Sequence, residues 1–169
     1  GVKPDLITLA KGISNAAVPA GAVAVRREIH DAILAAAQSG IEFFHGYTYS
    51  AHPLATAAIM ATLDIYEREQ LFQRAANLSG MFEDAAHSLR GTRHVIDVRN
   101  LGLVAGIELE PRPDAPGARA AEVFHKCFDK GLLVRYTGDI LAISPPLIIQ
   151  EDQIDQIFST IGEVLATID

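Results

Sequence analysis

Two short apolar runs lie near the start of the chain, separated by residues that favour turns. Residues 6–10 and 21–25 are each five-residue stretches of apolar and β-branched side chains, and the segment between them is rich in Gly, Ser, Asn and Pro. Continuous apolar runs of this length are typical of strands that are covered on both faces. We therefore expect two buried strands, followed by a helix over residues 27–38 that Ser39 and Gly40 stop.

A loop and a long helix are expected next. Residues 43–50 contain four aromatic side chains without helical or strand periodicity, which favours a loop. Pro53 follows His52 and is well placed in a first helical turn, where its missing N–H costs nothing. The pattern then predicts a helix over residues 54–69, and its many alanines allow the close packing found at an interface.

From about residue 71 the chain alternates between helical and strand patterns. Helices are expected at 71–89, 118–130 and 150–168, and strands at 94–100, 103–110, 132–136 and 140–144. Thr137, Gly138 and Asp139 suit a hairpin turn between the last two strands. The apolar stripe of the last helix requires a surface to cover, most simply the small sheet. These patterns predict an α+β domain over residues 71–169, after a first region of residues 1–70.

Composition narrows the class of protein. The net charge is −7 and Lys and Arg do not cluster, which argues against nucleic acid or an acidic membrane surface as partner. No apolar run approaches the roughly 20 residues that span a bilayer, and no basic leader precedes an apolar stretch, so a cytoplasmic protein is expected. Cys127 has the spacing of a core residue, and the six histidines lack ligand spacing, so no metal site is expected.

One lysine has a setting suited to covalent chemistry. Lys11 ends the first apolar run and directly precedes Gly12. A lysine amine attacks an aldehyde only when it is unprotonated, and apolar surroundings lower its pKa from about 10.4 in water. Of the other three lysines, Lys3 lies near a polar terminus, while Lys126 and Lys130 belong to an expected surface helix. Lys11 is therefore our candidate for a Schiff-base lysine. Taken by itself, it is more simply a strand-end lysine whose aliphatic stem lies along apolar surface while its amine reaches water, and the motifs further along the chain reverse this preference.

Three motifs in register resemble one enzyme family. They are Lys11-Gly-Ile-Ser-Asn, the loop His45-Gly-Tyr-Thr-Tyr-Ser-Ala-His-Pro, and Val134-Arg-Tyr-Thr-Gly-Asp followed by Ser144-Pro-Pro. In this order they resemble the class III pyridoxal-phosphate aminotransferases, and within them the ω-amino acid:pyruvate transaminases. The resemblance extends over essentially the whole chain. It implies an α/β protein of fold type I, with residues 1–70 ending the large cofactor-binding domain and residues 71–169 forming the complete small C-terminal α+β domain.

The resemblance also implies roles for three residues. Lys11 would be the catalytic residue, which holds pyridoxal 5'-phosphate as a Schiff base and then acts as base. Thr48 would bind the cofactor phosphate of the neighbouring subunit in a homodimer or a dimer of dimers. Arg135 would bind the substrate carboxylate, since a guanidinium can grip a carboxylate through two hydrogen bonds. From the residues alone, the simpler interpretation of Thr48 is a turn residue. For Arg135, a strand-edge ion pair, for example with Asp139, agrees with the residues as well as a ligand contact does.

The activity implied is transfer of an amino group from an ω-amino acid such as β-alanine, or from an amine, to pyruvate. Other class III aminotransferases, acting on ornithine, γ-aminobutyrate or diamino acids, remain alternatives. The family's acid for the pyridine nitrogen and its main phosphate-binding turn lie upstream of these motifs, and Asp5 is not that acid. This chain alone is therefore expected to be inactive, as a non-catalytic fragment with dimerisation elements.

Overall fold

The computed structural model describes residues 1–37, 41 and 43–169. These residues form two compact units, Gly1–Gln70 (unit 1) and Leu71–Asp169 (unit 2). The expected stop signals of the first helix, Ser39 and Gly40, lie outside the described residues. Within the described part of the chain, no helix is long and apolar enough to cross a membrane.

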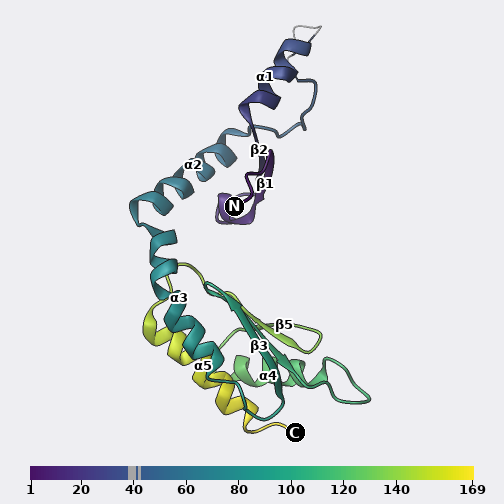
Figure 1. Cartoon of the computed structure of the whole chain (residues 1–169), viewed down its shortest axis with the longest axis vertical. Coiled ribbons are helices and arrows are strands. Elements are labelled where there is room, and N and C mark those ends of the chain that lie inside the picture. The colour runs from purple at the N-terminus through teal and green to yellow at the C-terminus, as the bar shows by residue number, and fades with distance from the viewer. Residues whose placement is uncertain (38–40, 42) are drawn as a thin grey trace. The chain divides into compact units, whose positions relative to one another are not determined.

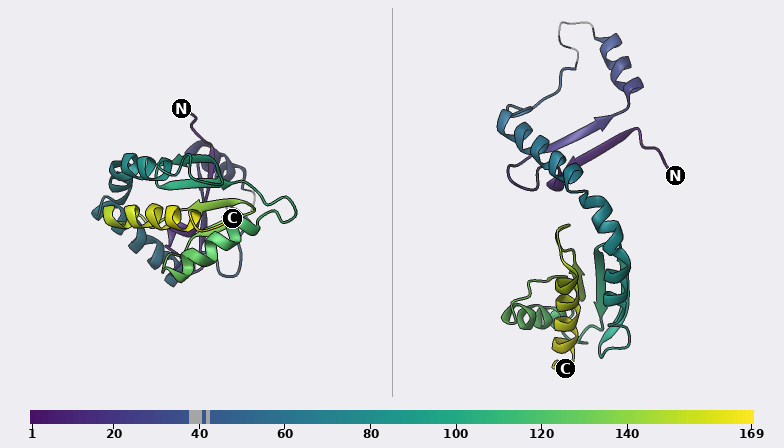
Figure 2. Two further views of the ribbon diagram at one scale, coloured as in Figure 1. Left: turned by 90° about the horizontal axis from the view of Figure 1, so that it is seen from below. Right: turned by 90° about the vertical axis from the view of Figure 1, so that its left-hand side faces the viewer.

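Unit 1 contains an antiparallel pair of strands and two helices. Strand β1, Leu6–Ala10, pairs with β2, Gly21–Val25, and the turn between them begins with a short 3-10 helix, η1, Lys11–Ile13. Helices α1, Arg27–Ala36, and α2, Pro53–Arg68, follow. The two strands run side by side in opposite directions in the right-hand view of Figure 2.

The expectation that these two strands are buried is wrong for this chain. Every residue of β1 and β2 is exposed, and Val23 retains 58% of its accessible surface. The apolar runs do form strands, but a two-stranded sheet has no further strands beside it, and no element of the described part of unit 1 buries either face. Both sheets formed by the described residues, the pair β1-β2 and the sheet of unit 2, are antiparallel.

Unit 2 is a four-stranded antiparallel sheet covered on one face by helices. The strands lie in the order β3-β4-β6-β5, and helices α3, α4 and α5 pack against the sheet and one another (Figure 1). The bounds are α3 Leu71–His87, β3 Val95–Leu101, β4 Val104–Leu109, α4 Ala118–Asp129, β5 Arg135–Thr137, β6 Ile140–Ile143 and α5 Glu151–Leu165. The hydrophobic core lies between the helices and the sheet.

The strand register decides which side chains face the helices. Val98 lies opposite Ile107, and Ile107 opposite Leu141; all three are buried in the core. One position along, the register aligns a row across all four strands, which therefore lies on the opposite face. This row consists of Arg99, Gly106, Ala142 and Arg135.

Strand β5 is shorter than the expected run of residues 132–136. Gly131 ends helix α4 in the left-handed conformation, with φ of 82°, and the Leu132 N–H donates to the Cys127 carbonyl at 2.9 Å. Leu132 therefore takes part in closing the helix. Strand pairing starts only at Arg135, which places this residue at the beginning of an edge strand.

Candidate active site

Lys11 lies at a sharp change of backbone direction. It follows the last residue of β1 and has φ of 55°, in the left-handed region that residues with a Cβ seldom adopt. Its carbonyl accepts from the Ser14 N–H at 3.2 Å, and the buried Ser14 hydroxyl donates to the Val18 carbonyl at 3.0 Å. The turn is also tied to helix α2, because the Tyr66 hydroxyl donates to the Gly12 carbonyl at 2.6 Å.

Among the described residues, the Lys11 amine has no polar partner, and its surroundings are not apolar. Lys126 pairs with Glu122, and Lys130 with Glu163, each at 3.0 Å. Within the described residues, Lys11 has no such ion pair or side-chain hydrogen bond. The dry setting expected of it is wrong for this chain: Lys11 is exposed because the strand beside it is uncovered.

Thr48 belongs to a loop that is stabilised by hydrogen bonds between its own residues. The Tyr47 N–H donates to the Ser50 hydroxyl, and the Ser50 N–H donates to the Tyr47 carbonyl, both at 2.9 Å. His52 then begins helix α2 by accepting from the Leu54 N–H at 3.3 Å. Thr48 lies within this turn, exposed, and its hydroxyl has no hydrogen-bond partner among the residues that the structure describes.

The aromatic side chains of the same loop are also exposed. Phe43, Phe44, Tyr47 and Tyr49 retain between 60% and 87% of their accessible surface. At these exposures the four rings lie at the surface of the described part of unit 1.

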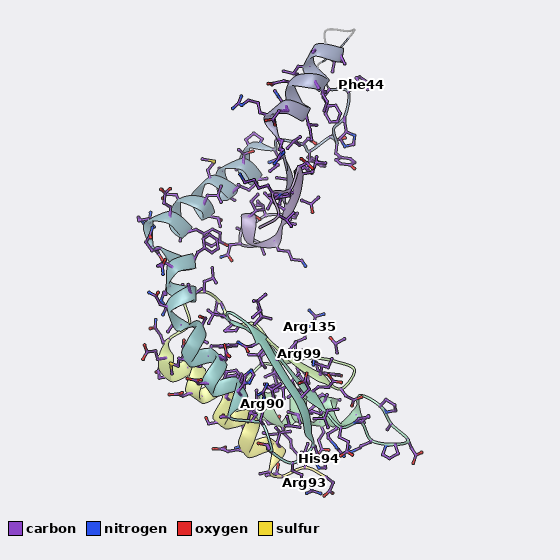
Figure 3. All side chains as sticks on the ribbon, viewed as in Figure 1. Phe44, Arg90, Arg93, His94, Arg99 and Arg135 are labelled. Carbon is purple, nitrogen blue, oxygen red and sulfur yellow. The ribbon has the colours of Figure 1, made fainter. Side chains whose placement is uncertain are left out.

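Arg135 lies in unit 2, on the sheet face opposite the helices (Figure 3). Because β5 is an edge strand, Arg135 also borders an open groove at the edge of the sheet, which is lined by β5, β6, the Ser144 to Pro146 segment and residues of α4 and α5. Asp139, its suggested ion-pair partner, instead accepts from the Gly117 N–H at 2.8 Å. Within the described residues, Arg135 forms no ion pair, so that alternative has no support.

Arg99, on the same row, differs from Arg135 in its charge balance. It donates to Asp97 at 2.6 Å and to Glu108 at 2.8 Å. Hydrogen bonds to Glu108 first, and to Asp97, raise the pKa of Arg99. Because two carboxylates neutralise Arg99, Arg135 is the arginine of this row with a guanidinium available to a ligand.

The three candidate residues are not gathered in one unit, since Lys11 and Thr48 belong to unit 1 and Arg135 to unit 2. Their positions alone therefore do not identify the protein, and comparison with known proteins shows its family. The family described as aminotransferase class-III matches residues 1–165. The chain belongs to this family.

Relatives of this class III aminotransferase chain are similar along its full length. It is 63% identical over 169 residues to an omega-aminotransferase of Caulobacter vibrioides, covering 100% of this chain and 38% of that protein. It is 43% identical to a beta-alanine--pyruvate aminotransferase of Pseudomonas aeruginosa, covering 98% and 37%. The chain thus spans between a third and two fifths of the length of these curated relatives.

The fold is that of the fold type I transferases. The omega transaminase from Pseudomonas jessenii, solved in complex with PMP, matches with a TM-score of 0.88 and 28% identity. The match covers 97% of this chain and 38% of that one. Both units of this class III aminotransferase chain therefore follow a known architecture.

The candidate residues fit pyridoxal phosphate by their chemistry. An uncommitted amine can bond to its aldehyde carbon, and an uncommitted hydroxyl can donate to its phosphate. Asp5, in contrast, forms an ion pair with Arg26 at 3.2 Å. The described residues thus offer an anchor and one phosphate contact.

Sequence analysis missed Tyr66. Tyr66 is four residues after Thr62, a spacing that puts both on one face of α2, but the burial on that face is known only from the structure. Thr62 is buried and donates to its own helix, at the Ala58 carbonyl. A tyrosine on such a face needs a partner for its hydroxyl. The partner, the Gly12 carbonyl, lies 54 residues away and could not be read from periodicity.

Proposed function

We propose that the intact protein is a transaminase that moves an amino group from an ω-amino acid such as β-alanine, or from an amine, to pyruvate. The observation that carries the proposal is the 63% identity, over the whole chain, to a protein named omega-aminotransferase. The identity of 43% to a beta-alanine--pyruvate aminotransferase supports the same donor and acceptor. Among the residues that the structure describes, the side chains of Lys11, Thr48 and Arg135 have no ion-pair or hydrogen-bond partner, which is consistent with binding of a ligand.

Lys11 would be both anchor and base. Its amine would hold pyridoxal 5'-phosphate covalently, and in its free form the same amine would take the proton from the substrate carbon that bears nitrogen and return it to the cofactor carbon that the amine had held. When bound, the cofactor supplies a ring into which the electrons left by that proton are delocalised. The chain therefore has to place one amine accurately rather than to supply a strong base.

Thr48 and Arg135 would bind the two ends of the cofactor-substrate pair. The Thr48 hydroxyl would donate to the cofactor phosphate of the neighbouring subunit, so that two chains of a homodimer complete each site. The Arg135 guanidinium would hold the substrate carboxylate through paired hydrogen bonds. Both groups are exposed, and neither has a competing partner among the described residues.

Peptide mapping tests the anchor directly. Borohydride reduction of the intact protein loaded with cofactor should leave a pyridoxyl adduct on Lys11. Lys126 and Lys130 serve as internal controls, because each is occupied by a glutamate. An adduct on either of them, with Lys11 unmodified, would overturn the assignment.

A donor panel tests the substrate class. The intact protein should use pyruvate with β-alanine and with simple amines faster than it uses ornithine or γ-aminobutyrate. Turnover of ornithine or γ-aminobutyrate in preference to β-alanine would place the protein in another group of class III enzymes.

A further inference from the structure

We propose that Tyr66 is a positioning residue for Lys11. Its hydroxyl, by donating to the Gly12 carbonyl, would hold the turn that aims the lysine amine. This inference rests on the proposed function of Lys11 and adds a residue that the motifs did not contain.

The contact is short and closely fitted. The Tyr66 hydroxyl lies 2.6 Å from the Gly12 carbonyl oxygen, which also accepts from the Asn15 N–H at 3.4 Å. A Cβ added at Gly12 would lie 3.3 Å from the same hydroxyl, which is tighter than ordinary van der Waals contact. Glycine after Lys11 therefore allows the tyrosine to reach the backbone.

The turn that receives this contact has an unfavourable backbone. Lys11, Asn15 and Ala16 have φ of 55°, 48° and 57°, and none of them is a glycine. Such conformations persist when surrounding contacts hold them, and they occur at sites where a side chain must be aimed. The Tyr66 hydrogen bond supplies such a contact from helix α2, outside the turn itself.

Accurate placement matters because Lys11 has to act at two carbons, one on the cofactor and one on the substrate. Misplacement of a reacting group by about 1 Å can reduce the rate about a hundredfold. Loss of the Tyr66 hydroxyl should relax the turn without removing the amine. We expect the chemical step to slow while binding of the keto acid is unaffected.

The test uses Tyr66→Phe in the intact, cofactor-loaded enzyme, since phenylalanine keeps the ring and removes only the hydroxyl. We expect kcat to fall about tenfold with the KM for pyruvate unchanged. A readout independent of turnover is the pH titration of the absorbance of the lysine-bound cofactor, whose midpoint should shift. Gly12→Ala, which places a methyl group against the Tyr66 hydroxyl, should lower kcat and shift the midpoint in the same way.

The matched control is Thr62→Val on the same helix. It also removes a hydroxyl that donates to a backbone carbonyl, that of Ala58 at 2.8 Å, but this bond stays within α2. It should leave both kcat and the titration midpoint as in the unchanged enzyme.

Two results would overturn the positioning role. One is a Tyr66→Phe enzyme with unaltered kcat and titration midpoint, and the other is an equal effect of Thr62→Val. Borohydride mapping of the unchanged enzyme separates these from a failure of the proposed function. An adduct on Lys11 together with an inert Tyr66→Phe rejects the positioning role alone, whereas no adduct on Lys11 rejects the proposed function.

Discussion

The two units are stabilised by different kinds of interaction. In unit 2, three helices enclose a core against one sheet face, and the rings of Phe82 and Phe158 meet edge to face at 5.2 Å inside it. In the described part of unit 1, Ser14 and Thr62 are the buried residues, and no hydrophobic side chain is buried. Unit 2 is therefore held by burial of apolar surface, and unit 1 by hydrogen bonds and local geometry.

This difference bears on where the chemistry lies. Lys11 and Thr48, the two residues proposed to hold the cofactor, belong to the unit without a core. Their backbone is fixed by specific polar contacts, such as the Tyr66 hydroxyl on Gly12 and the reciprocal bonds of the Tyr47 and Ser50 turn. We infer that unit 1 relies on further protein surface for burial, whereas Arg135 is carried by a unit with its own core.

The largest effect expected from this comparison concerns stability. Ile107→Ala, which empties a fully buried position of unit 2, should lower the free energy of unfolding by about 2 to 5 kcal/mol. Val23→Ala, at a 58% exposed strand position of unit 1, should change it by less than about 0.5 kcal/mol. Urea unfolding of the 169-residue chain provides both values. Equal losses would show that unit 1 has a core of its own.

Sequence periodicity could predict most of the elements, because helix and strand formation depends on local patterns. Strands β1 and β2 begin and end where the apolar runs do, and α1 to α5 are close to the expected helices. Burial could not be predicted for the strands, because the apolar run at residues 21–25 is the same whether or not another element covers it. Strand β5 is shorter than expected, since closure of α4 uses Leu132.

Candidate site residues could be proposed from the sequence where a motif is contiguous. Lys11, Thr48 and Arg135 each belong to a short segment, and their roles came from resemblance. Tyr66 was not predictable, because its contact with Gly12 joins segments 54 residues apart. The pairing of Arg99 with both Asp97 and Glu108 could not be predicted either, since it depends on the register between β3 and β4.

The next effect sharpens the comparison at the sheet face of unit 2. In the intact enzyme, Arg135→Ala should lower kcat/KM for β-alanine and pyruvate by roughly ten- to a hundredfold or more, because paired hydrogen bonds to a charged group are lost. The half-reaction with an amine that lacks a carboxylate should be much less affected. Arg99→Ala is the matched control on the same row, and it should affect neither donor. Equal losses with both donors would leave Arg135 a structural residue.

A smaller effect is expected in unit 1 at Thr48, which is proposed to make a single hydrogen bond. In the intact enzyme, Thr48→Ala should weaken cofactor affinity by about ten- to a hundredfold, since one bond to a charged group contributes about 1.5 to 3 kcal/mol. Thr48→Ser retains the hydroxyl and should restore most of the affinity. Equilibrium binding of the cofactor, followed by absorbance, measures both variants. Unchanged affinity in Thr48→Ala would contradict the phosphate contact.

The smallest effect comes from the core of unit 2 at alkaline pH. Burial raises the pKa of the Cys127 thiol to about 11, from 9.0 in an unburied thiol, while the nearby Lys130 charge opposes this shift. A raised pKa means that the unfolded chain loses its proton first, so this stability is complete below pH 9 and declines as the pH rises towards 11. At pH 10 the loss should be about 1 kcal/mol. Urea unfolding at pH 8 and pH 10 measures it, with Cys127→Ala as the control for all other titrating groups. If the two proteins lose equal stability over this range, the thiol is not shielded as the core of unit 2 requires.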